Sequence, residues 1–365
     1  MALLARELNG QGFDVLVAVF YGGGSLEAGL QELGVRIVSL QKRGRWDLIP
    51  FLLRLVRLVH HEKPDLVHGF QPVPNLLTLF LKTIYPATKT VWGIVASYMD
   101  LDRYDWLSRV VFPIQCFFSR FADMIIVNST AGRNYHEKRG IPSRKMIVIP
   151  NGIDTEMFRP DPGGRNKVRE AFGIGEREKL IGLVGRLDPM KDHPTFLRAA
   201  SILKDKRSVT LRFLCVGDGS NPYKSQIIDL ARDLGLDDSL LWAGSRSDMP
   251  DIYNALDVAV SSSYGEGLSN VICEAMACGV PCVVTDVGDS RWIVGDCGIV
   301  VPPKSPNSLA ESIITMLEKV ETQPDLGIRC RQRIVENFGI SNLVVNTIQA
   351  IRDLFKQYPK SSSLY

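Results

Sequence analysis

The chain has 365 residues, of which 45% are hydrophobic and 23% are charged, so it can bury a large core and is expected to form two domains. This composition excludes a mainly disordered chain, and a net charge of +3 is too small for a typical nucleic-acid-binding protein. The charge is uneven, because residues 1–150 carry 18 Lys and Arg against 12 Asp and Glu, whereas the remainder carries 25 against 28. The resulting +6 in the first part suits either an anionic partner, such as a membrane surface, or an ordinary solvated surface.

Apolar runs and amphipathic runs alternate along the first half of the chain. Continuous Val, Ile and Leu runs predict buried strands at 13–20, 35–40, 65–70, 90–97, 123–129 and within 145–154. Runs with a helical apolar period lie between them, at 26–34, 48–64, 75–85 and 106–122.

The same rhythm restarts in the second half, where strands are predicted at 179–187, 209–219, 239–245, 257–263, 281–287 and 298–303. Strands of continuous apolar residues, each followed by a helix, are typical of a parallel sheet covered on both faces. Two such series predict an α/β protein with two doubly wound domains. The turn-forming stretch 150–164 reads as the linker between them, and the pair Asn151–Gly152 predicts a tight turn.

Seven cysteines lie mostly inside apolar runs, which indicates buried, reduced thiols. Cys273, Cys278 and Cys282 lack the spacing of a zinc site. The longest apolar stretches are too short, or too interrupted by charge, to cross a bilayer, so we expect a soluble or peripheral protein.

Ligands of open parallel sheets bind beyond the carboxyl ends of the strands, and four segments of the second half have that position. They are "GRLDPMKD" after 180–184, "GDGS" after 211–216, "AGSRSDMP" after 240–243, and "YGEGLSNVICEAMACGVP" (264–281) after 257–263. We expect them to share one edge of the sheet.

The last of these segments combines a loop and a short helix. Ser269 or Asn270 is suited to cap the helix, whose free backbone amides and dipole favour an anion such as a phosphate. Glu266 precedes this positive end and Glu274 lies about one turn inside the helix. Carboxylates that accept two hydrogen bonds suit the vicinal diols of sugars or ribose, although two solvated glutamates are the simpler alternative.

Arg186 and Lys191, five positions apart around Pro189, supply matching positive charge. Together they can hold one diphosphate, Arg186 as a planar fork and Lys191 as a point charge. Either residue alone reads as an ordinary surface cation; combined with the helix start they indicate a specific site.

These motifs resemble those of the retaining, nucleotide-sugar-dependent glycosyltransferases of family 4, which have the two-domain GT-B fold with a cleft between two Rossmann-like domains. The similarity runs from about residue 60 to 345, through "PDLVH", "ADMIIVNS", "VIPNGID", "VGRLDPMKD", "VGDG", "EGLSNVICEAMACGVPCVVTDVG" and "CGIVVPP". It implies that Glu274 binds the nucleotide ribose, Glu266 the transferred sugar, and Arg186 and Lys191 the diphosphate. The donor site implied in this way comprises Gly185, Arg186, Lys191, Glu266, Gly267, Leu268, Ser269, Asn270, Val271 and Glu274.

The resemblance implies transfer of a sugar from a nucleotide-diphosphate sugar to a sugar or lipid-linked acceptor, with retention of configuration, in cell-envelope polysaccharide or glycolipid synthesis. Glu266, Arg186 and Lys191 would carry the chemistry, with no metal and no cofactor besides the donor. The pair Asp100-x-Asp102 looks like the manganese motif of another glycosyltransferase fold, and we interpret it as a loop because such pairs arise by chance. The alternatives are a sugar-nucleotide epimerase of the same fold and a non-catalytic or inactive sugar-nucleotide-binding protein.

The acceptor is expected in the first domain, with the protein in the cytoplasm or at the inner face of the membrane. Five basic residues could rest on an anionic bilayer, although a core-packing helix with solvated arginines is the stronger alternative; they are Lys42, Arg43, Arg45, Arg54 and Arg57. Apolar Ile94 and Val95 stand where many relatives carry a polar residue, often His. His68, at a strand end, reads as a cleft residue or a structural one.

The domain limits are expected at 1–157 for the acceptor side and 158–345 for the donor side, with a helix at 346–365 completing the first domain. Family members begin with a strand and a glycine-rich loop before a helix like the one that here starts at Met1. We therefore expect the first strand, of about five residues, to be missing from this sequence.

Overall fold

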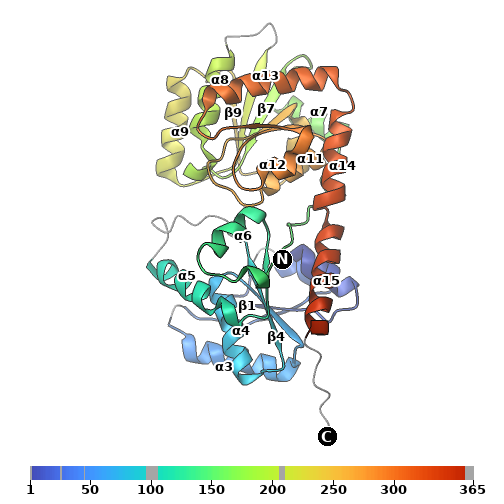
Figure 1. The fold of residues 1–365 in the computed structure, drawn as a ribbon. Helices are drawn as coiled ribbons and strands as arrows, with labels where there is room; N and C mark the ends of the chain where they lie inside the picture. Colours follow the sequence, from blue (N-terminus) through green and yellow to red (C-terminus); the bar gives the residue numbers. More distant parts are fainter. Residues whose placement is uncertain (1, 25–26, 45, 96–105, 205–209, 358–365) are drawn as a thin grey trace.

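The computed structural model describes residues 2–24, 27–44, 46–95, 106–204 and 210–357, which form two α/β halves built from parallel strands (Figure 1). This architecture confirms the expected fold of two doubly wound domains. Helices lie on both sides of the sheets in each half, and the last helix returns from the second half to the first.

The first half contains two sheets, one of order β1-β2 and one of order β3-β4-β5-β6. Its strands are β1 (Leu16–Val19), β2 (Arg36–Ser39), β3 (Leu66–Phe70), β4 (Lys89–Ile94), β5 (Met124–Val127) and β6 (Met146–Val148). Its helices are α1 (Ala2–Gly10), α2 (Glu27–Glu32), α3 (Leu48–Glu62), α4 (Pro72–Ile84), α5 (Trp106–Phe118) and α6 (Thr130–Glu137). A short 3-10 turn, η2 (Ser119–Phe121), extends α5.

Alternation along β4 sends neighbouring side chains to opposite faces of the four-stranded sheet. Fully buried Trp92 belongs to the same core cluster as Phe112 and Cys116 of α5. Fully buried Val91 belongs instead to a cluster with Ala350 and Ile351 near the end of the chain. One face of this sheet is therefore covered by α4 and α5, and the other by α15 (Ile340–Gln357).

The second half holds one six-stranded sheet of order β12-β11-β10-β7-β8-β9. Its strands are β7 (Lys179–Val184), β8 (Leu211–Val216), β9 (Leu240–Gly244), β10 (Val258–Ser261), β11 (Cys282–Thr285) and β12 (Ile299–Val301). Its helices are α7 (Pro162–Ala171), α8 (His193–Lys204), α9 (Asn221–Asp233), α10 (Met249–Ala255), α11 (Asn270–Ala277), α12 (Ser290–Val294), α13 (Pro306–Thr322) and α14 (Leu326–Phe338). The strand order reverses beside β7, which pairs with β8 on one side and β10 on the other. Such a reversal is where open parallel sheets bind ligands.

The chain crosses between the halves twice, and the two crossings are hydrogen-bonded to each other. The amide of Ile153 donates to the carbonyl of Phe338 at 2.8 Å, and the amide of Ile340 donates to the carbonyl of Ile153 at 3.1 Å. The predicted turn at Asn151–Gly152 is wrong, since neither residue is assigned to a turn. Gly152 is required for close packing instead, because a Cβ atom there would lie 2.8 Å from the Cα of Ile340.

All seven cysteines are buried and unpaired, as their apolar surroundings predicted. Burial raises the pKa of several of these thiols, Cys278 to about 12. Among the helices that the structure describes, none has both the length and the apolar character needed to cross a bilayer.

Candidate functional site

The loops that follow β7 and β8 are joined along the edge of the second sheet. The amide of Leu187 donates to the carbonyl of Asp218 at 3.0 Å, and Gly217 has a φ of +135°. A Cβ atom at Gly217 would lie 2.1 Å from the carbonyl oxygen of Gly185. Only glycine permits this contact, which fixes the backbone of Arg186 at the edge while its side chain remains exposed.

The loops that follow β7 and β10 are also tied together. A 3-10 turn at Pro189–Lys191 is capped by Asp188, whose carboxylate accepts from the amide of Met190 at 2.9 Å. The amide of Tyr264 donates to the carbonyl of Met190 at 3.0 Å, and the hydroxyl of Ser262 donates to the carbonyl of Lys191 at 2.9 Å. The segments "GRLDPMKD" and "YGEGLSN" therefore meet at the strand reversal, where the sequence predicted a shared edge.

At this junction Lys191 and Glu266 form an ion pair through Nζ and Oε1. Their side chains are only 23% and 13% exposed, and Ser263 donates a second hydrogen bond to the same carboxylate oxygen at 2.7 Å. The low exposure strengthens the attraction compared with a surface pair. A cation and a carboxylate are thus held side by side, next to the start of α11.

Glu274 lies on α11 in a different environment. Its Oε2 atom accepts a hydrogen bond of 2.7 Å from the hydroxyl of fully buried Tyr253 on α10. Burial raises the pKa of Glu274, and the hydrogen bond from Tyr253 opposes that effect. The two glutamates of the segment therefore have separate partners, as two separate binding roles require.

The first turn of α11 presents backbone amides at Asn270 and Val271 beside these side chains. Ser269, the cap residue, makes no side-chain cap hydrogen bond. The side chain of Asn270 accepts from Asn151 at 3.0 Å, which links the helix to the crossing between the halves.

Asp289 connects the second half to the first. Its Oδ2 and Oδ1 atoms accept hydrogen bonds from the backbone amides of Thr130 (2.7 Å) and Ala131 (2.9 Å), the first two residues of α6. The amide of Asp289 donates to the carbonyl of Gly267 at 2.9 Å. The loop that carries Glu266 is therefore coupled to a helix of the other half.

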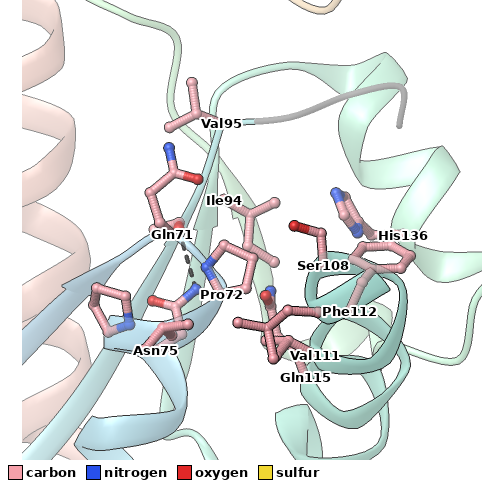
Figure 2. A pocket seen from close by; sticks show the side chains of 14 residues that line it. Gln71, Pro72, Asn75, Ile94, Val95, Ser108, Val111, Phe112, Gln115 and His136 are labelled. Atoms are coloured by element: carbon pink, nitrogen blue, oxygen red, sulfur yellow. Dashed lines mark hydrogen bonds between the residues drawn. The ribbon is translucent and has the colours of Figure 1, made fainter. Parts of the chain in front are cut away.

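A pocket of about 240 Å³ lies in the first half, beyond the carboxyl ends of β3 and β4 and between α4 and α5 (Figure 2). Its wall is mainly apolar and includes Ile94, Val95 and Phe112. Gln115 and Asn75 also line the pocket, and their side-chain oxygen atoms, Oε1 and Oδ1, are buried and have no hydrogen-bond partner in the described part of the protein. The Oδ1 atom of Asn75 faces Gly69 on β3. A ligand with apolar groups would match this wall.

For two residues of the first half, the structure distinguishes between the alternatives that the sequence left open. The guanidinium of Arg54 is bound to the carbonyl of Leu40 and to Asp47, both at 2.7 Å, so it is not free for an external anion. The rings of His68 and Phe70 are stacked, with their centroids 4.1 Å apart, and burial lowers the pKa of His68 to about 3. These are the surroundings of a structural histidine. Arg45, Asp100 and Asp102 lie outside the described residues.

Sequence reasoning missed Tyr253, Ser263 and Asp289. Tyr253 and Asp289 act through partners that lie far along the chain. Ser263 bonds to Glu266 three positions further along the same loop, but it belongs to no motif that the sequence singles out. Among the described residues, no three or more His, Cys, Asp or Glu side chains lie close enough together to bind a metal ion.

Comparison with known proteins assigns both halves to glycosyltransferase models. Residues 1–157 match the model described as Glycosyltransferase Family 4, and residues 178–319 match the model described as Glycosyl transferases group 1. The D-inositol 3-phosphate glycosyltransferase of Kineococcus radiotolerans is 30% identical over 250 residues, which cover 63% of this chain and 57% of that protein. The UDP-Gal:alpha-D-GlcNAc-diphosphoundecaprenol alpha-1,3-galactosyltransferase of Escherichia coli is 28% identical over 319 residues, which cover 83% of this chain and 78% of that protein.

Among solved structures, Anabaena Alr3699/HepE in complex with UDP has the same fold. The two chains superpose with a TM-score of 0.83 at 20% identity, over 96% of this chain and 94% of the Anabaena chain. The same protein has also been solved in complex with UDP-glucose.

Proposed function

The chain belongs to the family 4, group 1 glycosyltransferases, and from this membership we propose that it transfers a sugar from a nucleotide-diphosphate sugar to an acceptor with retention of configuration. The strongest single support is the ion pair of Lys191 and Glu266 beside the first turn of α11. It lies at the strand reversal of a parallel sheet, where the loops that follow β7, β8 and β10 are hydrogen-bonded to one another.

In this proposal, the donor lies across the start of α11. The free amides at Asn270 and Val271, together with Arg186 and Lys191, face the diphosphate. Glu274, oriented by Tyr253, takes the ribose hydroxyls, and Glu266 takes hydroxyls of the transferred sugar. Without donor, Glu266 and Lys191 neutralise each other, so the pair can exchange its mutual contact for contacts to sugar and phosphate.

The chemical step separates charge. Cleavage of the bond between the sugar and the diphosphate leaves negative charge on a phosphate oxygen and positive character on the sugar ring. Arg186, Lys191 and the helix amides stabilise that leaving group, and each preorganised donor of this kind contributes about 2 to 4 kcal/mol. The acceptor attacks the face from which the phosphate departs, and the phosphate takes the acceptor's proton.

The acceptor, in this proposal, enters the pocket between α4 and α5. Ile94 and Val95 contact its apolar part, and a rotation of the Gln115 side chain brings its unpaired Oε1 atom to a hydroxyl or amide group of the acceptor. A sugar or lipid-linked acceptor fits this combination, and the Escherichia coli relative is named for a diphosphoundecaprenol-linked acceptor. We accordingly place the protein at the inner face of the cytoplasmic membrane, in envelope polysaccharide or glycolipid synthesis.

A panel of nucleotide sugars tests the donor. We expect one of them to raise the melting temperature most and to be hydrolysed slowly, giving a nucleoside diphosphate and a sugar whose first-formed anomer, seen by NMR, retains the donor configuration. Lys191→Ala should abolish this hydrolysis, whereas Lys224→Ala, which removes an exposed cation paired with Asp218, should not. Epimerised sugar nucleotide would identify an epimerase instead, and a thermal shift without any turnover would identify a binding protein.

A further inference from the structure

The solvent-facing side of α5 and η2 is apolar. Five large side chains point outward from this segment, which we call the outer face of α5: Val110 (48% exposed), Ile114 (40%), Phe117 (55%), Phe118 (41%) and Phe121 (55%). Their spacing of three, four and seven residues places them along one side of the helix. The opposite side of the same helix is buried through Phe112 and Cys116.

A helix that is apolar on both sides is normally covered on both sides. The aromatic members of the outer face also contact one another, with ring centroids 5.2 Å apart for Phe117 and Phe118 and 6.1 Å apart for Phe118 and Phe121. In Figure 1, α5 lies at the outer edge of the first half, on the side away from α15. A contiguous exposed apolar patch of this kind marks an interaction surface.

Charge identifies what the surface fits. Residues 106–122 contain no Asp or Glu. Arg120 lies 4.2 Å over the ring of Phe117, and Lys145 donates to the carbonyl oxygens of Arg120 (2.5 Å) and Ala122 (2.6 Å). Aromatic side chains with basic residues at their margin are the composition of a helix that lies in the interface of an anionic bilayer.

We propose that the outer face of α5 docks on an anionic lipid bilayer and that the acceptor is therefore lipid-linked, the second statement resting on the proposed glycosyl transfer. The helix that would touch the lipid surface also lines the acceptor pocket, through Val111, Phe112 and Gln115 (Figure 2). A lipid-linked acceptor can thus reach the pocket without leaving the membrane. A second copy of the chain fits less well, because self-association through this face would bring like charges together.

Vesicle sedimentation tests the surface. Full-length protein is mixed with vesicles of phosphatidylcholine alone, or with 30% phosphatidylglycerol, at low and high salt. We expect binding to the anionic vesicles that is at least about tenfold stronger than to the neutral ones and that weakens with salt. The double variant Phe117→Ser, Phe121→Ser should lose at least about tenfold of this binding. The control Ile328→Ser, Val345→Ser removes two equally exposed side chains (69% and 63%) from α14 and α15 and should bind like the wild type.

Hydrolysis of the nucleotide sugar separates the two proposals. The double variant should hydrolyse donor in solution at the wild-type rate, because the outer face does not touch the donor loops. Vesicle binding without any hydrolysis would overturn the glycosyl transfer and keep the docking surface. The docking surface would be overturned if the wild-type protein does not bind anionic vesicles at low salt, or if both double variants lose vesicle binding equally. A dimer, seen by light scattering, that only the phenylalanine variant dissociates would also overturn it.

Discussion

The carboxylate of Asp289 accepts a hydrogen bond of 2.7 Å from the backbone amide of Thr130, across the boundary between the two halves of the protein. With the second bond to Ala131, it caps a helix that belongs to the other sheet. Its own amide is bonded to Gly267, next to Glu266. Approach of the two halves and the position of the donor loop are therefore linked through one side chain.

Removal of this cap should loosen the contact between the two halves. Asp289→Ala leaves the first amides of α6 without their anionic partner, a loss of about 0.5 to 2 kcal/mol for a helix cap. We expect a larger radius of gyration in solution scattering and a lower kcat/KM. Asp286→Ala is the matched control, since Asp286 lies in the same loop but pairs with Arg291 at 2.7 Å within the second half. Identical scattering curves for wild type and Asp289→Ala would contradict the coupling.

The two glutamates should differ in what they bind. Glu274→Ala should weaken binding of the nucleoside diphosphate, with or without the sugar, by about 1 to 3 kcal/mol, because a charge-assisted hydrogen bond is lost. Glu266→Ala frees Lys191 from its ion pair, so the affinity for free nucleoside diphosphate should be unchanged or higher, and only the nucleotide sugar should bind more weakly. Tyr253→Phe should reproduce part of the Glu274→Ala effect, since it removes the 2.7 Å bond that orients the carboxylate. Calorimetric titration measures all three, and equal losses of nucleoside diphosphate affinity in both glutamate variants would refute the division of roles.

Arg186 should act mainly in the transition state. Its guanidinium is exposed and has no partner among the described residues, so it is free to meet charge that develops on the leaving diphosphate. Arg186→Ala should therefore lower kcat more than it raises KM for the donor. Arg232→Ala, which removes an exposed arginine paired with Asp229 on α9, should change neither value. A raised KM with unchanged kcat would assign Arg186 to ground-state binding alone.

His193 should make the protein less stable in mild acid. Burial, with a smaller contribution from neighbouring Lys191, lowers its pKa to about 4. Below an unfolded-state pKa of about 6.5, His193 is protonated in the unfolded chain but stays neutral in the folded protein. The free energy of unfolding is therefore highest above that pH and falls as the pH decreases toward 4. The loss reaches about 3 kcal/mol at the end of this range.

Urea unfolding at pH 7 and pH 4.5 measures this loss. His193→Gln should reduce the difference between the two pH values, whereas His60→Gln, at an exposed position on α3, should preserve it. An unchanged pH difference in His193→Gln would show that other groups cause the acid sensitivity.

Gln115 should serve the acceptor and not the fold. Its buried Oε1 atom has no partner in the described structure, so Gln115→Leu removes an unsatisfied polar group and should leave the melting temperature unchanged or higher. The same variant should raise KM for the acceptor while hydrolysis of the donor continues at its normal rate. Gln332→Leu on α14, where the amide is exposed and bonded to Glu336, controls for the loss of an amide. A lower melting temperature in Gln115→Leu would identify a structural residue.

The sequence predicted the strands and the meeting of the loops that follow them well, because apolar runs and glycine positions are local features. Continuous apolar runs set the strands, and the glycines at 217 and 219 mark the backbone contact with the loop after β7. The sequence could not predict that Tyr253 is the partner of Glu274, because Tyr253 lies on another helix and belongs to no motif. The bond between Asp289 and Thr130 joins residues 159 positions apart, which no periodicity encodes.

Two local rules also failed for physical reasons. The pair Asn151–Gly152 has the composition of a turn, but packing of Gly152 against Ile340 decided its conformation. The apolar run in 106–122 predicted a helix, but not a helix that is apolar on two sides. Its two-sided apolar character became informative only when the structure showed which side the sheet covers.

The position of α15 also affects the order in which the protein matures on the ribosome. Ala350, Ile351 and Leu354 complete the core beneath Val91 and Met124, yet they are translated after the whole second half. At a translation rate of about 5 to 20 residues per second, this face of the first sheet stays uncovered for roughly 10 to 40 seconds before α15 is synthesised. The second half needs no such wait, because its sheet and α7 to α14 are contiguous in the chain. The half that is made later is thus the first to have all the helices that cover its sheet.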